Sequence, residues 1–360
     1  MTVPLHATQA PSRLKVAVLG IGQMGLVSAG ILAGPESGPL ATAAAPAPKV
    51  ALWGRSADEA GRLLQTRCSP KLVDFRLPDR VEVSLKLATA IQGASLIVSA
   101  IPVQFVRDVW RQVRPLIGPD VAVLSVAKGI ETPSLLRVSQ VIADVLMDDP
   151  DAKPRAIGCL SGPTIAPELA RCLPAAMIAA SEDEAFAKRV QALFTTSWLR
   201  VYTNTDLIGV ELAGAVKNVV AIAAGIVDGL GAGNNAKSAL LARGLAEISR
   251  LGVAMGASRE TFFGIAGVGD LATSCFSREG RNRSCGEALG RGMALADYLA
   301  KTPFVVEGVA TCKAVVALAR VHAVEMPICE SVHAVLFDGV DPIEAIGRLM
   351  TRDAKPERVG

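Results

Sequence analysis

The sequence predicts an α/β domain with a buried parallel sheet, followed by an all-helical domain. Short apolar runs alternate with helical segments as far as Asp206, and beyond it the segments are long, rich in Ala and Leu, and helical. Hydrophobic residues make up 51% of the 360 residues and aromatic residues only 4%, which is typical of sheets and helices packed through small side chains. We therefore expect a flexible extension over 1–13 and domains over 14–203 and 204–355.

The α/β domain is expected to begin with a strand over Lys15–Leu19 and a helix over Met24–Ala33. The Ala- and Pro-rich segment Gly34–Pro48 is a loop by composition. A helix over Ala57–Thr66 follows, with Ser56 as its N-cap. Another helix is expected at Val103–Arg114, and further strands at Val50–Trp53, Leu96–Ala100, Val121–Val126, Ala156–Leu160 and Ala175–Ala180.

The second domain is expected to be built from helices alone. These are predicted at Ile208–Asp228, Ala236–Met255, Cys285–Arg291, Val309–Val321 and Cys329–Phe337. An uncharged stretch over Leu87–Val106 is broken by Gly93 and Pro102, so we do not expect it to span a membrane.

Charge and cysteine usage exclude several classes of protein. The formal net charge is +3, too weak for a general nucleic-acid binder, which needs a basic stripe and stacking aromatic side chains. Seven Cys with no CxxC pair and no zinc-site spacing indicate free thiols in a reducing cytosol and no metal site. The first twelve residues contain no apolar run of a signal peptide, so we expect a cytoplasmic protein.

A GxGxxG pattern lies directly after the first predicted strand and opens the first predicted helix. In this context Gly20 permits the tight turn, and Gly22 lets backbone N–H groups approach a pyrophosphate. Gly25 lets the helix pack closely against the strand, and the helix N-terminus favours the anion. The pattern predicts a Rossmann-type dinucleotide site, the alternative being a glycine turn without a ligand.

The end of the second strand indicates which dinucleotide is bound. An NAD-selective site places Asp or Glu there, whereas this chain has Arg55. A guanidinium pairs with a 2′-phosphate and stacks on adenine, so NADP(H) is favoured and NAD(H) is possible. A solvated loop charge is the alternative for Arg55.

Lys217 is the first candidate for a reactive residue. Within Val210–Val227 the only polar residues are Glu211, Lys217 and Asn218, so this helix is expected to be buried. Glu211 is six positions away, about 240° around the helix, and cannot pair with Lys217 locally. A buried Lys facing a cleft suits a general acid for a carbonyl group. The alternative is a Lys paired with a carboxylate from elsewhere in the chain.

Three further segments carry groups that suit an anionic substrate. Ser277–Arg283 offers three Arg and one Asn, which suits either a phosphate clamp or a solvated charged loop. Ser161–Thr164 follows a strand and is either a polar binding loop or a plain turn. Lys128 ends a strand, where the binding sites of α/β proteins gather. The three His are isolated, and we expect His6 in the N-terminal tail and His322 and His333 in helices, with structural roles.

Seven motifs in order resemble the NAD(P)-dependent glycerol-3-phosphate dehydrogenases of bacteria, from about residue 14 to residue 355. They are Gly20–Gly25, Lys128–Glu131, Ser161–Thr164, Glu211–Val219, Gly267–Leu271, Arg281–Arg283 and Val306–Gly308. The resemblance implies a helical domain of the 6-phosphogluconate-dehydrogenase type. It implies interconversion of dihydroxyacetone phosphate and sn-glycerol 3-phosphate, which supplies phospholipid synthesis.

The resemblance also implies residue roles. Lys217 would be the catalytic proton donor or acceptor at C2 of the substrate. Substrate would be held by Lys128, Gly162, Thr164, Lys217, Asp270, Gly280, Arg281 and Asn282. Cofactor would be held by Gly20, Gly22, Gln23, Met24, Gly25, Arg55, Lys128, Ala166, Arg281, Val305 and Glu307. Gln23 and Met24 stand where the family commonly has Ser and Trp, and Thr164 stands where Ser is common.

Two other functions fit parts of the same pattern. One is another two-domain NAD(P)-dependent hydroxyacid or 6-phosphogluconate-type dehydrogenase, whose helix carries Lys and Asn at a different spacing. The other is a non-catalytic redox sensor that binds the dinucleotide, which has no need of Lys217, Asp270 and Arg281 together. A homodimer formed through the apolar helical domain is compatible with the sequence.

Overall fold

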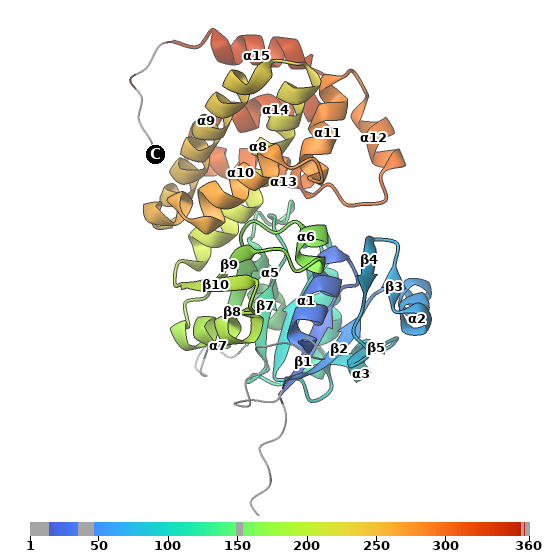
Figure 1. The fold of residues 1–360 in the computed structure, drawn as a ribbon. Helices are drawn as coiled ribbons and strands as arrows, with labels where there is room; N and C mark the ends of the chain where they lie inside the picture. Colours follow the sequence, from blue (N-terminus) through green and yellow to red (C-terminus); the bar gives the residue numbers. More distant parts are fainter. Residues whose placement is uncertain (1–13, 35–46, 149–153, 354–355, 357–360) are drawn as a thin grey trace, which may run out of the picture.

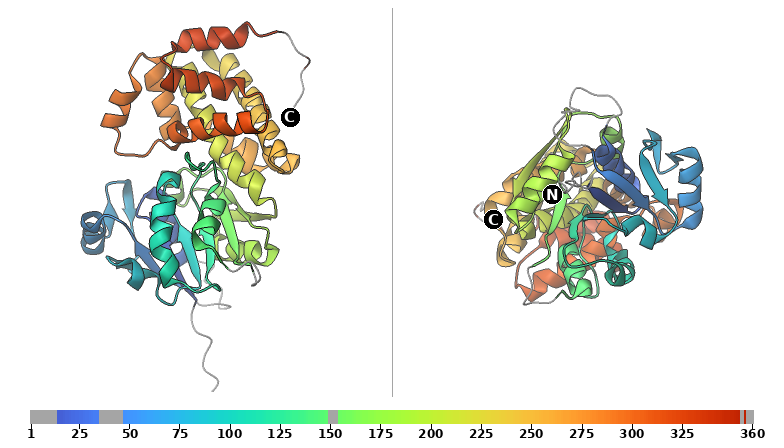
Figure 2. Two further views of the ribbon diagram at one scale, coloured as in Figure 1. Left: turned by 180° about the vertical axis from the view of Figure 1, so that it is seen from behind. Right: turned by 90° about the horizontal axis from the view of Figure 1, so that it is seen from below.

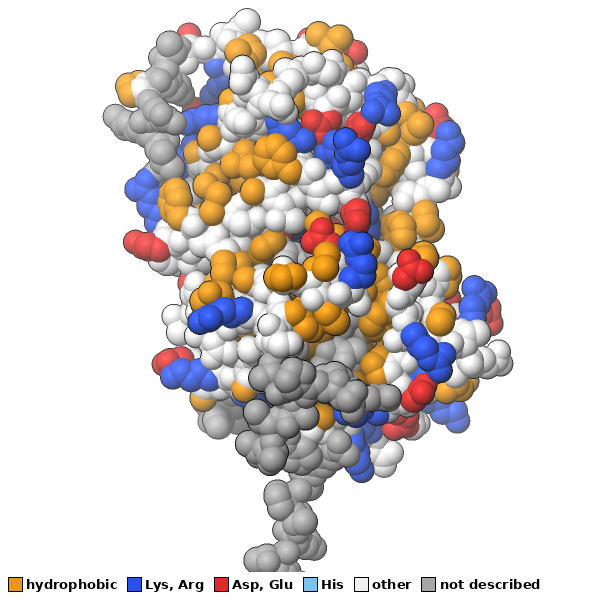
Figure 3. Space-filling model, viewed as in Figure 1, with side chains coloured by type: hydrophobic (Ala, Val, Ile, Leu, Met, Phe, Trp, Pro, Cys, Tyr) orange, Lys and Arg blue, Asp and Glu red, His pale blue; other side chains and the backbone are white. Residues whose placement is uncertain are grey.

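The chain folds into an α/β part and a helical part stacked on one end of its sheet (Figures 1 and 2). The computed structural model describes residues 14–34, 47–148, 154–353 and 356. The predicted extension over 1–13, with His6, and most of the predicted loop over 34–48 lie outside the described residues. On the face shown in Figure 3, Lys and Arg side chains are interspersed with Asp and Glu.

The α/β part contains an eight-stranded sheet in the order β10-β9-β8-β7-β6-β1-β2-β5. Its strands are β1 (Lys15–Leu19), β2 (Lys49–Trp53), β5 (Val81–Ser84), β6 (Leu96–Ser99), β7 (Ala122–Ser125), β8 (Ile157–Ser161), β9 (Ala175–Ala180) and β10 (Leu199–Asn204). All neighbouring strands are parallel except β8 and β9, so the expectation of a parallel sheet is wrong at this pair. The segment between them contains only the five-residue helix α6 (Ala166–Ala170) and turns the chain back. A separate hairpin is formed by β3 (Cys68–Ser69) and β4 (Leu72–Arg76).

Helices cover both faces of the sheet because its strands are apolar on both sides. Along β1, Val16 and Val18 join one core, and Ala17 and Leu19 join the core on the opposite face, as strand alternation requires. The first face is covered by α1 (Gln23–Ala33), α6 and α7 (Glu184–Phe194). The second is covered by α3 (Leu87–Ile91), α4 (Val106–Val113) and α5 (Val138–Leu146).

The predicted N-cap of α2 (Ala57–Thr66) is confirmed, because the Ser56 side chain accepts a hydrogen bond from the backbone N–H of Glu59. The helix predicted over Val103–Arg114 is α4 flanked by the 3₁₀ turns η1 (Val103–Phe105) and η2 (Arg114–Leu116).

The helical part is organised around α8 (Leu207–Gly229), which is buried along almost its whole length. Its neighbours are α9 (Gly233–Ala254), α10 (Asp270–Phe276), α11 (Arg281–Gly290), α13 (Glu307–Val321) and α14 (Pro327–Phe337). The part is completed by η3 (Arg259–Phe263), η4 (Ile265–Gly269), α12 (Leu295–Lys301) and α15 (Pro342–Met350). Helix α8 is long and apolar enough to cross a membrane, but 94% of its apolar window is buried inside the protein, as in a core helix.

A buried ion pair joins α8 to the α/β part. Glu211 pairs with Arg137, which precedes α5, and its Oε1 accepts a hydrogen bond from the backbone N–H of Ser139 at 2.8 Å. The expectation that Glu211 does not pair with Lys217 is confirmed. His333 lies in α14, but His322 follows the last residue of α13, so its predicted place within a helix is wrong by one position.

Helices α8 and α11 approach so closely that glycine is required at their contact. A Cβ added to Gly286 would lie 1.9 Å from the carbonyl oxygen of Ile222, and one added to Gly225 would lie 1.9 Å from that of Arg283. These distances are far below van der Waals contact, and the obstructing atoms are backbone, so a substitution must push the helices apart.

We therefore predict that Gly286→Ala lowers the melting temperature by about 1–4 °C, because overpacking of a core costs about 1–3 kcal/mol and each kcal/mol shifts the melting temperature of a chain this long by about 1–2 °C. Gly61→Ala on α2 is the matched control, since no described atom lies within 4 Å of the added Cβ. Alanine there should leave the melting temperature unchanged or raise it slightly. Thermal unfolding followed by circular dichroism measures both, and equal melting temperatures for the two variants would contradict the prediction.

Candidate active site

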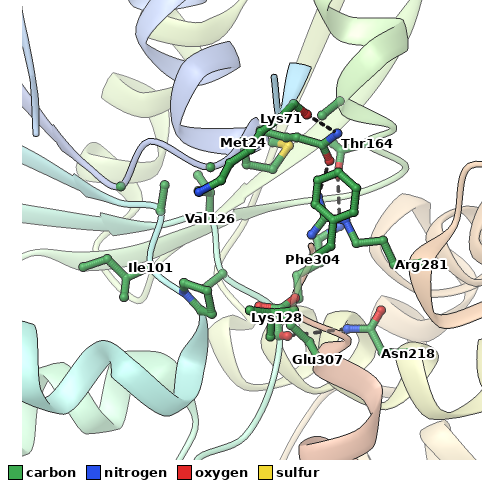
Figure 4. Close-up of a pocket in the computed structure, with 18 of the residues that line it drawn as sticks. Met24, Lys71, Ile101, Val126, Lys128, Thr164, Asn218, Arg281, Phe304 and Glu307 are labelled. Atoms are coloured by element: carbon green, nitrogen blue, oxygen red, sulfur yellow. Dashed lines mark hydrogen bonds between the residues drawn. The ribbon is translucent and has the colours of Figure 1, made fainter. Parts of the chain in front are cut away.

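A cavity of about 730 Å³ lies where the helical part meets the carboxyl ends of the strands (Figure 4). Its walls include most of the site residues predicted from the sequence, which come from both parts of the chain. These are Gly20, Gly22, Gln23, Met24, Arg55, Lys128, Thr164, Ala166, Lys217, Asp270, Gly280, Arg281, Asn282, Val305 and Glu307. Gly25 and Gly162 are not among the lining residues, and both lie directly behind the wall, as described below.

The glycine turn at one end of the cavity has the geometry of an anion cradle. Gly20 has φ +119°, and a Cβ there would lie 2.4 Å from the carbonyl oxygen of Ala100. A Cβ on Gly25 would lie 1.8 Å from the carbonyl oxygen of Gly20, so this position serves close packing. Gly22 precedes α1 and has no side chain to cap it, and a Cβ added there would meet no described atom within 4 Å. Within the described chain the backbone N–H groups of Gln23 and Met24 have no hydrogen-bond acceptor, which fits the pyrophosphate of a dinucleotide.

Arg55 also lines the cavity, two residues after the end of β2. Its guanidinium carbon is 5.1 Å from the centre of the Phe105 ring. Nearby, Lys71 of the β3–β4 hairpin pairs with Glu59 at 2.7 Å, and both residues line the cavity. This end of the cavity therefore carries two cations, of which one is neutralised by a carboxylate.

Two lysines share one buried carboxylate at the centre of the cavity. Lys217 Nζ lies 2.6 Å from Asp270 Oδ1, and Lys128 Nζ lies 2.7 Å from Asp270 Oδ2. The Asp270 side chain is 1% exposed. The cluster of two ammonium groups and one carboxylate carries a net charge of +1, which suits an anion or a developing oxyanion. The alternative considered for Lys217, pairing with a carboxylate from elsewhere, is thus correct, and the carboxylate lines the same cavity.

Lys128 is held from three directions. Besides Asp270, its Nζ donates to the carbonyl oxygen of Gly162 at 2.8 Å and to Thr164 Oγ1 at 3.2 Å. Burial lowers the pKa of Lys128 to about 8, the positive charge of Lys217 lowers it as well, and Asp270 opposes both effects. Gly162 from behind the cavity wall and Thr164 from within it therefore hold the Lys128 ammonium group in place.

Ser274 is a site residue that was not predicted from the sequence. Lys217 Nζ donates a hydrogen bond to Ser274 Oγ at 2.6 Å. Ser274 follows Asp270 by four residues in α10, so the two side chains lie on one face of the helix. The four-residue spacing of Asp270 and Ser274 could have revealed this pair, but no helix was predicted over 270–276.

The predicted cluster of three Arg on Ser277–Arg283 is only partly correct. Arg281 lines the cavity, whereas Arg278 does not. Arg283 also reaches the cavity wall but is ion-paired with Asp228 at 2.5 Å and with Glu287 at 3.3 Å. Its charge is therefore neutralised within the helical part, and Arg281 is the arginine of this segment with its charge available to a ligand.

The three arginines differ in their surroundings because α11 begins at Arg281, four residues earlier than predicted, and places Arg281 and Arg283 in its first turn. Gly280 precedes it without a side-chain cap, and within the described chain the amides of Arg281, Asn282 and Arg283 have no hydrogen-bond acceptor. Three free N–H groups at the N-terminus of a ten-residue helix, next to the Arg281 guanidinium, form a site for an anion such as phosphate.

The Asn282 side chain connects three helices. Its Oδ1 accepts a hydrogen bond from the backbone N–H of Gly308 at 2.9 Å, and its Nδ2 donates to Asn218 Oδ1 at 2.9 Å. Gly308 follows Glu307 at the start of α13, and burial raises the pKa of Glu307. The free amides of α11 are thus held in a fixed position relative to α8 and α13.

The described residues offer neither a metal site nor a disulfide bond. Within the part of the chain that the structure describes, no group of three or more His, Cys, Asp or Glu is placed to hold a metal ion. All seven Cys are described, and each is a free thiol.

Comparison with known proteins matches both parts of the chain to one family. Residues 15–187 match the N-terminal model of NAD-dependent glycerol-3-phosphate dehydrogenase, and residues 206–347 match the C-terminal model. A glycerol-3-phosphate dehydrogenase (NAD(P)+) of Streptomyces griseus is 43% identical, over 96% of this chain and 98% of the relative. One of Geobacter sulfurreducens is also 43% identical, over 96% and 99%.

Solved structures agree with this match. The crystal structure of glycerol-3-phosphate dehydrogenase from Coxiella burnetii has a TM-score of 0.87 at 33% identity, and the match covers 95% of this chain and all of that one. A ketopantoate reductase of Ralstonia eutropha, at 15% identity and a TM-score of 0.57, shares the fold alone. The motifs, the two-part fold and these matches together show that the chain belongs to the NAD-dependent glycerol-3-phosphate dehydrogenase family.

Proposed function

We propose that this enzyme interconverts dihydroxyacetone phosphate and sn-glycerol 3-phosphate, using a nicotinamide dinucleotide as the hydride carrier. The observation that carries the proposal is the Lys128–Asp270–Lys217 cluster, which lies in one cavity with the glycine turn and the free amides of α11. The glycine turn suits a dinucleotide, the lysine cluster suits a carbonyl group, and the free amides of α11 suit a phosphate. The product would supply phospholipid synthesis.

Lys217 protonates the substrate in this proposal. A nicotinamide dinucleotide held in this cavity would supply the hydride for C2. The Lys217 ammonium then gives a proton to the oxygen on C2, and in the reverse direction the neutral amine takes it back. Asp270 and Ser274 hold Nζ of Lys217 in place, at 2.6 Å each. The net charge of +1 on the cluster stabilises the developing alkoxide before the proton moves.

The N-terminus of α11 holds the phosphate in this proposal. The amides of Arg281, Asn282 and Arg283 and the Arg281 guanidinium would bind its oxygens, next to Gly280. Because the phosphate is remote from C2, its binding energy orients the carbonyl toward Lys217. Lys128 and Thr164 would contact the substrate between these two ends.

The proposed cofactor-binding residues form the rest of the cavity wall. They are Gly20, Gly22, Gln23, Met24, Arg55, Lys128, Ala166, Arg281, Val305 and Glu307. Gly25 would act from behind the turn by allowing α1 to pack closely. We propose a preference for NADP(H) over NAD(H), supported by Arg55 after β2, where NAD-selective sites carry an acid.

We further propose that the enzyme works in the cytoplasm, supported by its seven free thiols. We also propose a homodimer formed through the helical part. Its support is the exposure of apolar side chains there, among them Val321, Ile343 and Met350.

The test of the proposed function is steady-state oxidation of NADPH in the presence of dihydroxyacetone phosphate. Lys217→Ala should lower kcat by about 10³-fold, the order of a lost general acid, while NADPH still binds. Lys188→Ala, which removes an exposed Lys from α7, is the matched control. Turnover of 6-phosphogluconate instead would favour the other dehydrogenase class, and cofactor binding without any turnover would favour a sensor.

The pH profile of kcat/KM for dihydroxyacetone phosphate should fall as pH rises through about 8, because Lys128 loses its positive charge there. Lys128→Arg keeps a charge that does not titrate in this range, so the fall near pH 8 should disappear even though the rate is lower. Rates measured between pH 6.5 and 10 decide this. If the fall in kcat/KM near pH 8 persisted in Lys128→Arg, it would be caused by a group other than Lys128.

Arg55→Ala should lower kcat/KM for NADPH by about tenfold and change that for NADH by less than twofold, because one charge-assisted contact to a 2′-phosphate is lost. Arg62→Ala on α2 is the control, since Arg62 is exposed and does not line the cavity. Equal losses with NADPH and NADH would leave Arg55 without a role in selecting the cofactor.

A further inference from the structure

The Gln23 side chain joins the two parts of the protein across the cavity. Gln23 is the first residue of α1, in the glycine turn. Its Oε1 accepts a hydrogen bond from Nη2 of Arg281, the first residue of α11. Its Nε2 donates to the carbonyl oxygen of Lys71, in the turn of the β3–β4 hairpin, at 2.8 Å. Figure 4 shows Lys71, Arg281 and Phe304 gathered at this wall.

The two hydrogen bonds fix the orientation of the Gln23 amide. The Lys71 carbonyl can only accept a hydrogen bond and the Arg281 guanidinium can only donate one. If the amide were turned over, its NH₂ would face the guanidinium and its oxygen would face the carbonyl, and both contacts would be repulsive. The amide oxygen is therefore held toward Arg281 by the hairpin.

Among the described residues no carboxylate forms an ion pair with Arg281, although the buried Glu307 lies close enough for its charge to raise the pKa of Arg281 against the effect of burial. Its guanidinium carbon lies 4.9 Å from the centre of the Phe304 ring, and its hydrogen-bond partner Gln23 is a neutral amide. Arg283, two residues further along α11, is instead paired with two carboxylates, Asp228 and Glu287. A phosphate group carries up to two negative charges, so it outcompetes a neutral amide for a guanidinium but competes poorly with carboxylates.

We propose that Gln23 is a positioning residue for the substrate's phosphate, because it holds Arg281 at the N-terminus of α11 through a neutral contact that the phosphate can replace. The inference rests on the proposed function, since it requires a phosphorylated substrate at α11. It gives Gln23 a role toward the substrate in addition to any contact with the cofactor. Removal of the amide leaves the long Arg281 side chain free to adopt other rotamers, and binding of phosphate must then order it.

The test compares dihydroxyacetone phosphate with dihydroxyacetone, which lacks the phosphate. The measured quantity is the ratio of kcat/KM for the two substrates, because an effect of Gln23 on cofactor binding acts on both and cancels. Gln23→Ala should lower this ratio by about five- to tenfold. Gln23→Glu should lower it further, because a carboxylate competes with phosphate for Arg281. Arg62→Ala, at an exposed position of α2 outside the cavity wall, is the control and should leave the ratio unchanged.

A double-mutant cycle decides whether Gln23 acts through Arg281. Arg281→Ala should lower the ratio strongly, and adding Gln23→Ala should then have no further effect. As a second readout, titration calorimetry of sn-glycerol 3-phosphate into the enzyme saturated with NADPH, a pair that cannot react, should show a dissociation constant five- to tenfold higher in Gln23→Ala than in the wild type.

Two results would overturn the inference: a wild-type ratio in Gln23→Ala, or effects of the two substitutions that multiply in the double variant. Failure of the proposed function is distinct, because the wild type would then not reduce dihydroxyacetone phosphate at all.

Discussion

The sharing of Asp270 by two lysines is the interaction on which the site depends. Lys128 lies three residues after the end of β7 and Lys217 in the middle of α8, so the carboxylate joins the α/β part to the helical part. A buried ammonium group without a partner is costly, and two close together repel each other. With Asp270 between them, both lysines stay next to the substrate position, and the group as a whole remains positive.

Close packing of the helices brings these charges together. Gly214 of α8 lies against Ser161 and Lys128, and a Cβ there would come within 3.1 Å of Ser161 Oγ. About three turns further along α8, Gly225 lets α11 approach, which sets the free amides of α11 beside the cavity. The small side chains of this aromatic-poor chain therefore have a chemical consequence, because they let helix backbones approach the reacting groups.

The two arginines at the start of α11 differ in the groups that they contact, and this difference decides which of them can bind an anion. Arg283 is ion-paired with carboxylates and joins α11 to the end of α8, whereas the contacts of Arg281 within the described chain are a neutral amide and an aromatic ring, with Glu307 nearby but not ion-paired. The exchangeable partner leaves Arg281 available to an anion. A net charge of +3 over the whole chain conceals this arrangement, since what matters is which cations lack a carboxylate.

The sequence by itself determined the features that depend on local pattern. Examples are the bounds of β1 and β9, the Ser56 cap, the glycine turn, and Lys217 on a buried helix. Strands β5 and β10 were not predicted, because polar residues such as Glu82 and Arg200 interrupt the apolar runs that revealed β1 and β9. Only the tertiary structure decided that β9 runs antiparallel to β8, that Ser274 meets Lys217, and that Gln23 meets Arg281. These contacts join residues that are up to 258 positions apart, and hydrogen-bond partners at that distance are chosen by the packing of whole elements and leave no local pattern.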